Sequence, residues 1–135
     1  MEYVIGIVIA LVVTGGSTAL RFDRERVFYP AMMIVVASYY VLFAAIGASA
    51  PVLIAESIVA GAFMLLAVIG FKSRLWVVVI ALASHGVFDL GHHLVVDNPG
   101  VPQWWPGFCS AFDIGAAAYL AFLLTKNPRL VRQAG

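Results

Sequence analysis

The chain of 135 residues has few charged residues and almost no cysteine. Asp, Glu, Lys and Arg make up only 11% of it, against about 25% in an average soluble domain, and 63% is hydrophobic. A soluble domain of this size could not bury so much apolar surface in one core. The single cysteine excludes an internal disulfide framework. A net charge of +1, with no basic stripe among the aromatics, argues against a nucleic-acid partner.

Long apolar runs take up most of the chain. There are five, and each is close to the ~20 residues that a helix needs to cross ~30 Å of hydrocarbon. They cover residues 3–20, 27–50, 52–71, 75–96 and 107–125. The runs are too long and too unalternating for barrel strands, and no proline falls in a helix interior. We therefore predict an all-α membrane bundle of five transmembrane helices, forming one domain over residues 1–135.

The basic residues fall on one side of this predicted bundle. They lie between the first two runs, between the third and fourth, and in the tail: Arg21, Arg24, Arg26, Lys72, Arg74, Lys126, Arg129 and Arg132. The loops on the other side, 47–51 and 97–106, contain none. The positive-inside rule then predicts an outside N-terminus and a cytoplasmic C-terminus in the inner membrane. The first run follows an acidic leader, so we expect it to be a retained helix and not a cleaved signal.

Two features of the outer side and the fifth helix concern packing. Trp104 and Trp105 are typical of an aromatic belt at the membrane interface, and the alternative is a cap over a site that opens outward. Gly107, Ala111 and Gly115 form a row of small residues at i, i+4 and i+8. Such a row predicts close helix packing, either within the bundle or in a homo-oligomer.

All three histidines lie in one short segment, residues 84–93. On a helix, His85, Asp89 and either His92 or His93 share one face. With a rise of ~1.5 Å per residue, His85 lies ~15 Å from the inner end of its helix, near the middle of the bilayer. Ionisable groups at that depth are costly and are usually functional. A purely structural His85–Asp89 hydrogen bond is the alternative.

Two further acids are predicted at a similar level. Glu56 lies ~6 Å below the outer end of the third helix, Asp113 ~9 Å below that of the fifth, and Asp89 ~10 Å deep in the fourth. Glu56 could instead reach water, and Asp113 could bond Ser110. Three carboxylates facing one another would not all ionise, and no Lys or Arg lies within these helices. Protonation, histidinium partners or a bound cation could resolve the conflict.

A bound metal is the interpretation that we favour. Carboxylate oxygen and imidazole nitrogen together suit zinc, iron or manganese better than calcium or magnesium. We predict His85, Asp89 and one of His92 and His93 as ligands of a divalent transition metal, zinc or iron. The function would then be a metal-dependent hydrolase of a lipid or another apolar substrate, with Glu56 or Asp113 as general base.

Three other side chains near this region have plainer interpretations. Cys109 lies one turn before Asp113 on the same side of its helix, but a buried free cysteine usually acts as a small hydrophobe. Tyr39 and Tyr40 could supply a hydroxyl, although tyrosines at such positions usually pack with one satisfied hydrogen bond.

Three alternative functions remain open. A proton- or cation-coupled carrier of a small solute would use the same carboxylates as titrating relays. A b-type haem protein could use His85 or His92 as an axial ligand, although haem usually takes ligands from facing helices. The chain could also be a structural or accessory membrane subunit whose polar residues meet a partner.

The residues of the last two helices also carry a resemblance. In segments 85–92 and 98–109 the chain resembles a family of small bacterial integral-membrane proteins of unknown function. Because the activity of that family is unknown, the resemblance implies the membrane fold and no residue roles.

A second, looser similarity to a known group of proteins rests only on the types of residue present. The chain is similar to the membrane hydrolases that include the alkaline ceramidases and the adiponectin-receptor-like proteins, which hold zinc with three histidines near an aspartate and a serine. The matching residues here are Ser84, His85, Asp89, His92 and His93. The similarity implies zinc-dependent hydrolysis, but those proteins have seven helices and spread their histidines over several of them.

Overall fold

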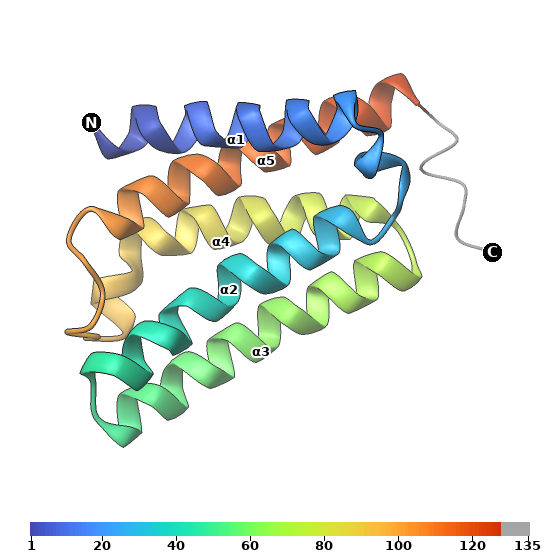
Figure 1. The fold of residues 1–135 in the computed structure, drawn as a ribbon. Coiled ribbons are helices and arrows are strands. Elements are labelled where there is room, and N and C mark those ends of the chain that lie inside the picture. The colour runs from blue at the N-terminus through green and yellow to red at the C-terminus, as the bar shows by residue number, and fades with distance from the viewer. Residues whose placement is uncertain (128–135) are drawn as a thin grey trace.

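The computed structural model describes residues 1–127, and in that part of the chain the regular secondary structure consists of helices, without strands (Figure 1). The elements are α1 (Glu2–Ala19), a short 3-10 helix η1 (Phe22–Arg24), α2 (Phe28–Gly47), α3 (Ala50–Lys72), α4 (Leu75–Val95) and α5 (Trp105–Lys126). All five α-helices are long and apolar enough to cross a membrane. The predicted set of five apolar helices is therefore confirmed, while membrane insertion and orientation stay predictions.

The helix ends differ from the predicted ones where prolines start a helix. α2 ends at Gly47 and α3 begins at Ala50. The short connection between them therefore lies within the apolar run, residues 27–50, that predicted the second helix. Pro51 lies in the first turn of α3, and Pro106 lies in the first turn of α5 instead of before it. The fixed φ of proline suits a first turn, where its missing N–H would have no helical partner.

The helices form a sequence of neighbours in space that differs from their order in the chain. α5 lies between α1 and α4, α4 packs against α3, and α3 packs against α2. Buried apolar side chains from α2, α3, α4 and α5 form the core. α1 adds no side chain to this core and packs through one face, whose buried residues are Gly6, Ala10, Thr14 and Ser17, mainly against α5.

Small residues allow the close contact between α1 and α5. Ala111 lies against Gly6, and Gly115 lies against Ala10. A Cβ added at Gly6 would meet the Phe108 carbonyl oxygen and would come within 2.9 Å of the Ala111 Cβ. The predicted row of small residues on α5 thus serves packing within the bundle, and a homo-oligomer stays a prediction.

We expect Gly6→Ala to destabilise the protein by about 1–3 kcal/mol, because the new methyl group forces α1 away from α5. Gly15→Ala on the same helix is the matched control, since nothing lies within 4 Å of a Cβ at that position. It should be neutral or stabilising, by up to about 1 kcal/mol of helix propensity. Thermal unfolding in detergent measures both variants. Equal effects would show that the α1–α5 contact is looser than described.

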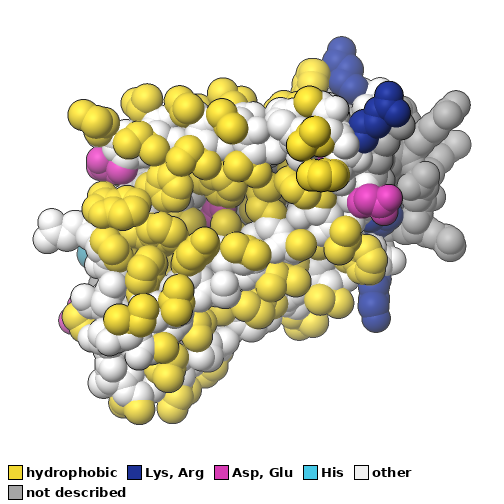
Figure 2. Space-filling model, in the orientation of Figure 1, with side chains coloured by type: hydrophobic (Ala, Val, Ile, Leu, Met, Phe, Trp, Pro, Cys, Tyr) yellow, Lys and Arg dark blue, Asp and Glu magenta, His cyan; other side chains and the backbone are white. Residues whose placement is uncertain are grey.

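The described basic residues gather at one end of the bundle. On the face drawn in Figure 2, the visible Lys and Arg side chains lie at the end that carries the α1–α2 connection. Arg26 from this connection donates hydrogen bonds to the carbonyl oxygens of Gly70, Phe71 and Ser73 at 3.0–3.3 Å, where α3 ends. It thereby satisfies carbonyls that have no partner within the helix. Arg129 and Arg132, which entered the prediction of orientation, lie outside the described residues.

Candidate metal centre

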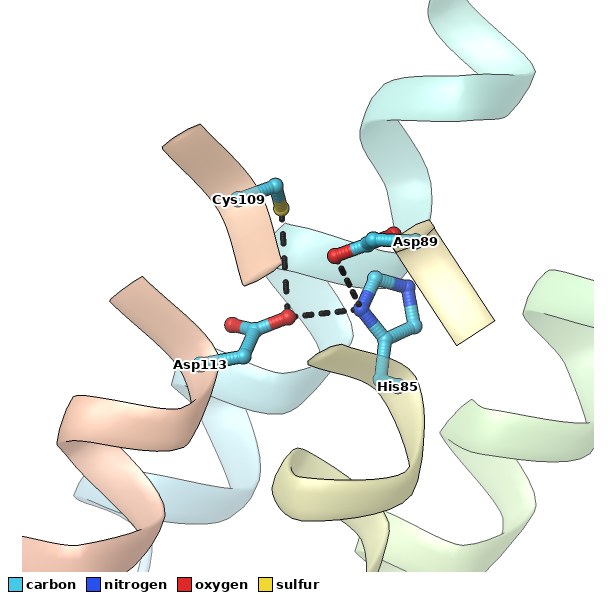
Figure 3. Close-up of side chains that lie close together, drawn as sticks. All are labelled: His85, Asp89, Cys109 and Asp113. Atoms are coloured by element: carbon cyan, nitrogen blue, oxygen red, sulfur yellow. Dashed lines mark hydrogen bonds and ion pairs between the residues drawn. The ribbon is translucent and has the colours of Figure 1, made fainter. Parts of the chain in front are cut away.

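Four potential metal ligands meet between α4 and α5: His85, Asp89, Cys109 and Asp113 (Figure 3). We call them the central group. Their ligand atoms all lie within 4.8 Å of one another. His85 Nδ1 and Asp113 Oδ2 are hydrogen-bonded at 2.6 Å, and the same nitrogen lies 3.5 Å from Asp89 Oδ2. The Cys109 thiol donates to Asp113 Oδ2 over 3.8 Å.

The central group is closed off from solvent and is incompletely hydrogen-bonded. The two aspartates are 0% exposed, His85 is 1% exposed and Cys109 is 2% exposed. Both carboxylate oxygens of Asp89 and Oδ1 of Asp113 lack a hydrogen-bond partner. Among the described residues, His85 is the one group able to carry a positive charge that pairs with either aspartate. Buried carboxylates without full pairing are costly, so the pocket favours a cation.

The local sequence explains why these side chains meet. His85 and Asp89 are spaced i, i+4 on α4, and Cys109 and Asp113 are spaced i, i+4 on α5, so each pair lies on one face of its helix. α4 and α5 are joined by the loop of residues 96–104 and pack closely against each other. The two pairs are at similar distances from this loop, which brings them to the same level of the bundle.

The donor set of the central group could hold a metal ion. It offers one imidazole nitrogen, one thiol sulfur and carboxylate oxygens. Zinc binds N, O and S ligands at about 2.0–2.3 Å, and in its usual tetrahedral geometry two ligands of one ion lie about 3.3–3.8 Å apart. The most distant ligand atoms of the central group would therefore have to approach each other by about 1 Å to hold one ion.

No family model, curated protein or solved structure matches the chain. The resemblances drawn from the sequence thus stay predictions, and the geometry alone must carry the functional argument.

A second polar cluster lies at the end of the bundle that carries the α4–α5 loop. His92 Nε2 and Glu56 Oε1 are 2.9 Å apart, and the Asn98 amide donates to the same oxygen at 2.8 Å. The amide also donates to the Tyr40 carbonyl oxygen at 3.1 Å. All three side chains are buried. We call Glu56, His92 and Asn98 the outer cluster. It ties together α2, α3, α4 and the loop.

Tyr40 lies between the outer cluster and the central group. Its ring stacks on His92, with centroids 4.0 Å apart and an interplanar angle of 18°. Its hydroxyl is buried without a hydrogen-bond partner, and its ring centroid lies 6.2 Å from that of His85 in the central group. Tyr40 could therefore supply a hydroxyl to the central group. Tyr39, the other candidate, instead packs its ring against Trp105 at 4.8 Å.

The structure brings together some of the predicted site residues and separates others. The predicted proximity of His85, Asp89 and Asp113 is confirmed, while Glu56 contacts His92 and Asn98 in the outer cluster. The side chain of His93 is exposed, so of the adjacent pair it is His92 that faces inward. The ligand roles of His92 and His93, and the general-base roles of Glu56 and Asp113, stay predictions.

The sequence analysis did not predict that Cys109 lies beside His85, Asp89 and Asp113, and it did not single out Asn98. Cys109-x3-Asp113 repeats the spacing of His85-x3-Asp89 on the adjacent helix, and this shared spacing is the signal that could have identified the fourth member of the group. Asn98 lies in a loop rich in turn-forming residues, where an asparagine normally indicates only a turn. Nothing in its sequence context indicates that it contacts Glu56.

Proposed function

We propose that this is a multi-pass protein of the cytoplasmic membrane that binds one divalent transition metal ion through His85, Asp89, Cys109 and Asp113. The central group carries the proposal, because four fully buried residues with metal-ligating side chains, from two helices, bring their ligand atoms within 4.8 Å of one another. A divalent cation would bring twice the positive charge of a protonated His85 to the two aspartates.

The donor set favours zinc or iron over harder cations. Calcium and magnesium prefer six or more oxygen ligands, whereas this group includes sulfur and nitrogen. Thiolate and imidazole are ligands that zinc and iron share. Metal binding requires these ligands to be deprotonated, so it would displace the proton between His85 and Asp113. We therefore expect metal affinity to fall as the pH is lowered.

The distribution of charge supports an outside N-terminus. The described Lys and Arg residues lie in the α1–α2 and α3–α4 connections and at the end of α5, and these belong to one end of the bundle. The positive-inside rule assigns this end to the cytoplasm. The outer cluster, the loop of residues 96–104 and the start of α5 at Trp105 then lie at the outer end of the bundle, and the central group lies beneath them.

Metal analysis of the purified protein tests this function. We expect about one zinc or iron ion per chain in wild type after purification without chelators. His85→Ala and Asp113→Ala should each hold less than about a tenth of that, because a structural site needs its full set of ligands to hold the ion. His93→Ala and Asp97→Ala are the matched controls, since both side chains are exposed. Wild-type protein without stoichiometric metal, even after incubation with zinc and iron, would overturn the proposal.

A further inference from the structure

A long apolar groove runs between α1 and α2, and side chains of α5 form its floor. Its volume is about 1230 Å³. Figure 2 shows it as a hollow ringed by hydrophobic side chains. The groove exists because α1 packs against α5 and not against α2.

Acidic side chains line the groove only at its two ends. Glu2 and Trp104 lie at one end, and Phe22 and Glu25 lie at the other. Between them the walls are aliphatic and aromatic, with α1 contributing side chains such as Ile9 and α2 contributing Val35. The groove therefore follows the helices for most of their length. The length of each half of the groove then corresponds to the ~15 Å that one leaflet contributes to a ~30 Å hydrocarbon layer.

The floor of the groove reaches the central group at one point. Cys109 lines the groove, and its thiol donates to Asp113 Oδ2. Asp113 is 0% exposed and its other oxygen, Oδ1, has no partner. Cys109 lies about 6 Å, or four residues, into α5 from the end that carries Trp104. A molecule in this half of the groove would thus lie beside the central group.

We propose that the groove binds the acyl chain of a bilayer lipid from the leaflet on the Trp104 side, placing that chain against Cys109. The membrane location and the neighbouring metal rest on the proposed function; the groove itself does not. The ligand that the central group meets would then be a long-chain lipid that arrives sideways from the membrane.

The shape of the walls favours a flexible chain over a helix of another protein. Helices associate in membranes through small residues that allow close approach and through polar side chains that bond across the interface. The walls instead carry bulky side chains such as Met32, Phe108 and Phe112, and their polar residues lie at the ends. An acyl chain can fill such an irregular surface, at about 0.8 kcal/mol for each CH₂ group that it buries.

Photo-crosslinking with phosphatidylcholine that carries a diazirine on one acyl chain tests the proposal in vesicles. We expect adducts to concentrate on the groove residues of α1, α2 and α5. Val35→Trp should reduce them about tenfold, because an indole in the groove excludes two or more CH₂ groups. Ile9→Trp, on the opposite wall, repeats the test if Val35→Trp does not fold. Ile58→Trp is the matched control, because Ile58 is 68% exposed on α3 and does not line the groove.

Three results would overturn the proposal: adducts spread evenly over all helices, adducts unchanged by both groove variants, or a dimer whose interface covers the groove. Metal content is measured on the same samples. Groove adducts without bound metal would overturn only the proposed function, and bound metal without groove adducts would overturn only the lipid site. The single cysteine gives a second readout, because Val35→Trp should slow alkylation of metal-free Cys109 by a lipid-soluble maleimide and Ile58→Trp should not.

Discussion

Zinc should raise the thermal unfolding midpoint of the wild-type protein by on the order of 10 °C and should leave that of His85→Ala unchanged. The ligands come from two helices, so the site exists only in the folded bundle. Free metal at 100 times its dissociation constant stabilises the folded state by about 2.7 kcal/mol. For a domain of this size, each kcal/mol corresponds to roughly 4 °C. Differential scanning fluorimetry of detergent-purified, chelator-treated protein measures the shift.

Two matched variants separate a specific site from general metal effects. His93→Ala removes an exposed histidine from the same helix and should keep the full shift. Cys109→Ser keeps the size of the side chain but replaces the soft ligand, so it should weaken zinc binding by at least about tenfold. An equal shift in wild type and His85→Ala would place the metal elsewhere on the protein and would contradict the assignment of the central group.

Glu56→Ala should lower the free energy of unfolding by about 3–5 kcal/mol and should leave the metal content unchanged. Glu56 is 1% exposed and accepts hydrogen bonds from both His92 and Asn98. Removing the carboxylate leaves two buried polar groups without their acceptor, and breaking a buried pair in this way costs about that much. Denaturant titration in detergent micelles, followed by elemental analysis of the same preparation, measures both quantities.

Glu56→Gln keeps a carbonyl oxygen that can accept these hydrogen bonds, so it should lose less than half as much stability. Glu25→Ala removes an exposed glutamate and is the control for the loss of charge alone. If Glu56→Ala also lost its metal, then Glu56 would belong to the metal centre, and the division into a central group and an outer cluster would be wrong.

Much of the fold could be predicted because it depends on local properties of the chain. An apolar run of about 20 residues can satisfy its backbone in a membrane only as a helix, whatever its neighbours are. The boundaries were less certain where apolar residues continue beyond the end of a helix. Residues 48–50 are small and Ser49 is the single polar residue among them, so the apolar run predicted that the second helix continues to Ala50, whereas α2 ends at Gly47.

The candidate site could be predicted only in part, from the spacing of residues within a helix and from their depth. The i, i+4 spacing placed His85 and Asp89 on one face, and the depth argument placed Asp113 at their level. The depth of Glu56 was equally suggestive, yet its helix packs against α4 so that the carboxylate reaches His92, one turn beyond Asp89. Depth along the membrane normal says nothing about the rotation of a helix about its own axis.

The sequence by itself determined that the chain forms five apolar helices, that its basic residues lie in alternate connections, and that ionisable side chains lie deep within the helices. These properties follow from composition and from the fixed rise and turn of a helix. Only the tertiary structure decided that Cys109 joins His85, Asp89 and Asp113, that Glu56 pairs with His92, and that α1 leaves a groove beside α2. These outcomes depend on which helices are neighbours and which faces they turn toward each other, and close packing between particular side chains sets both.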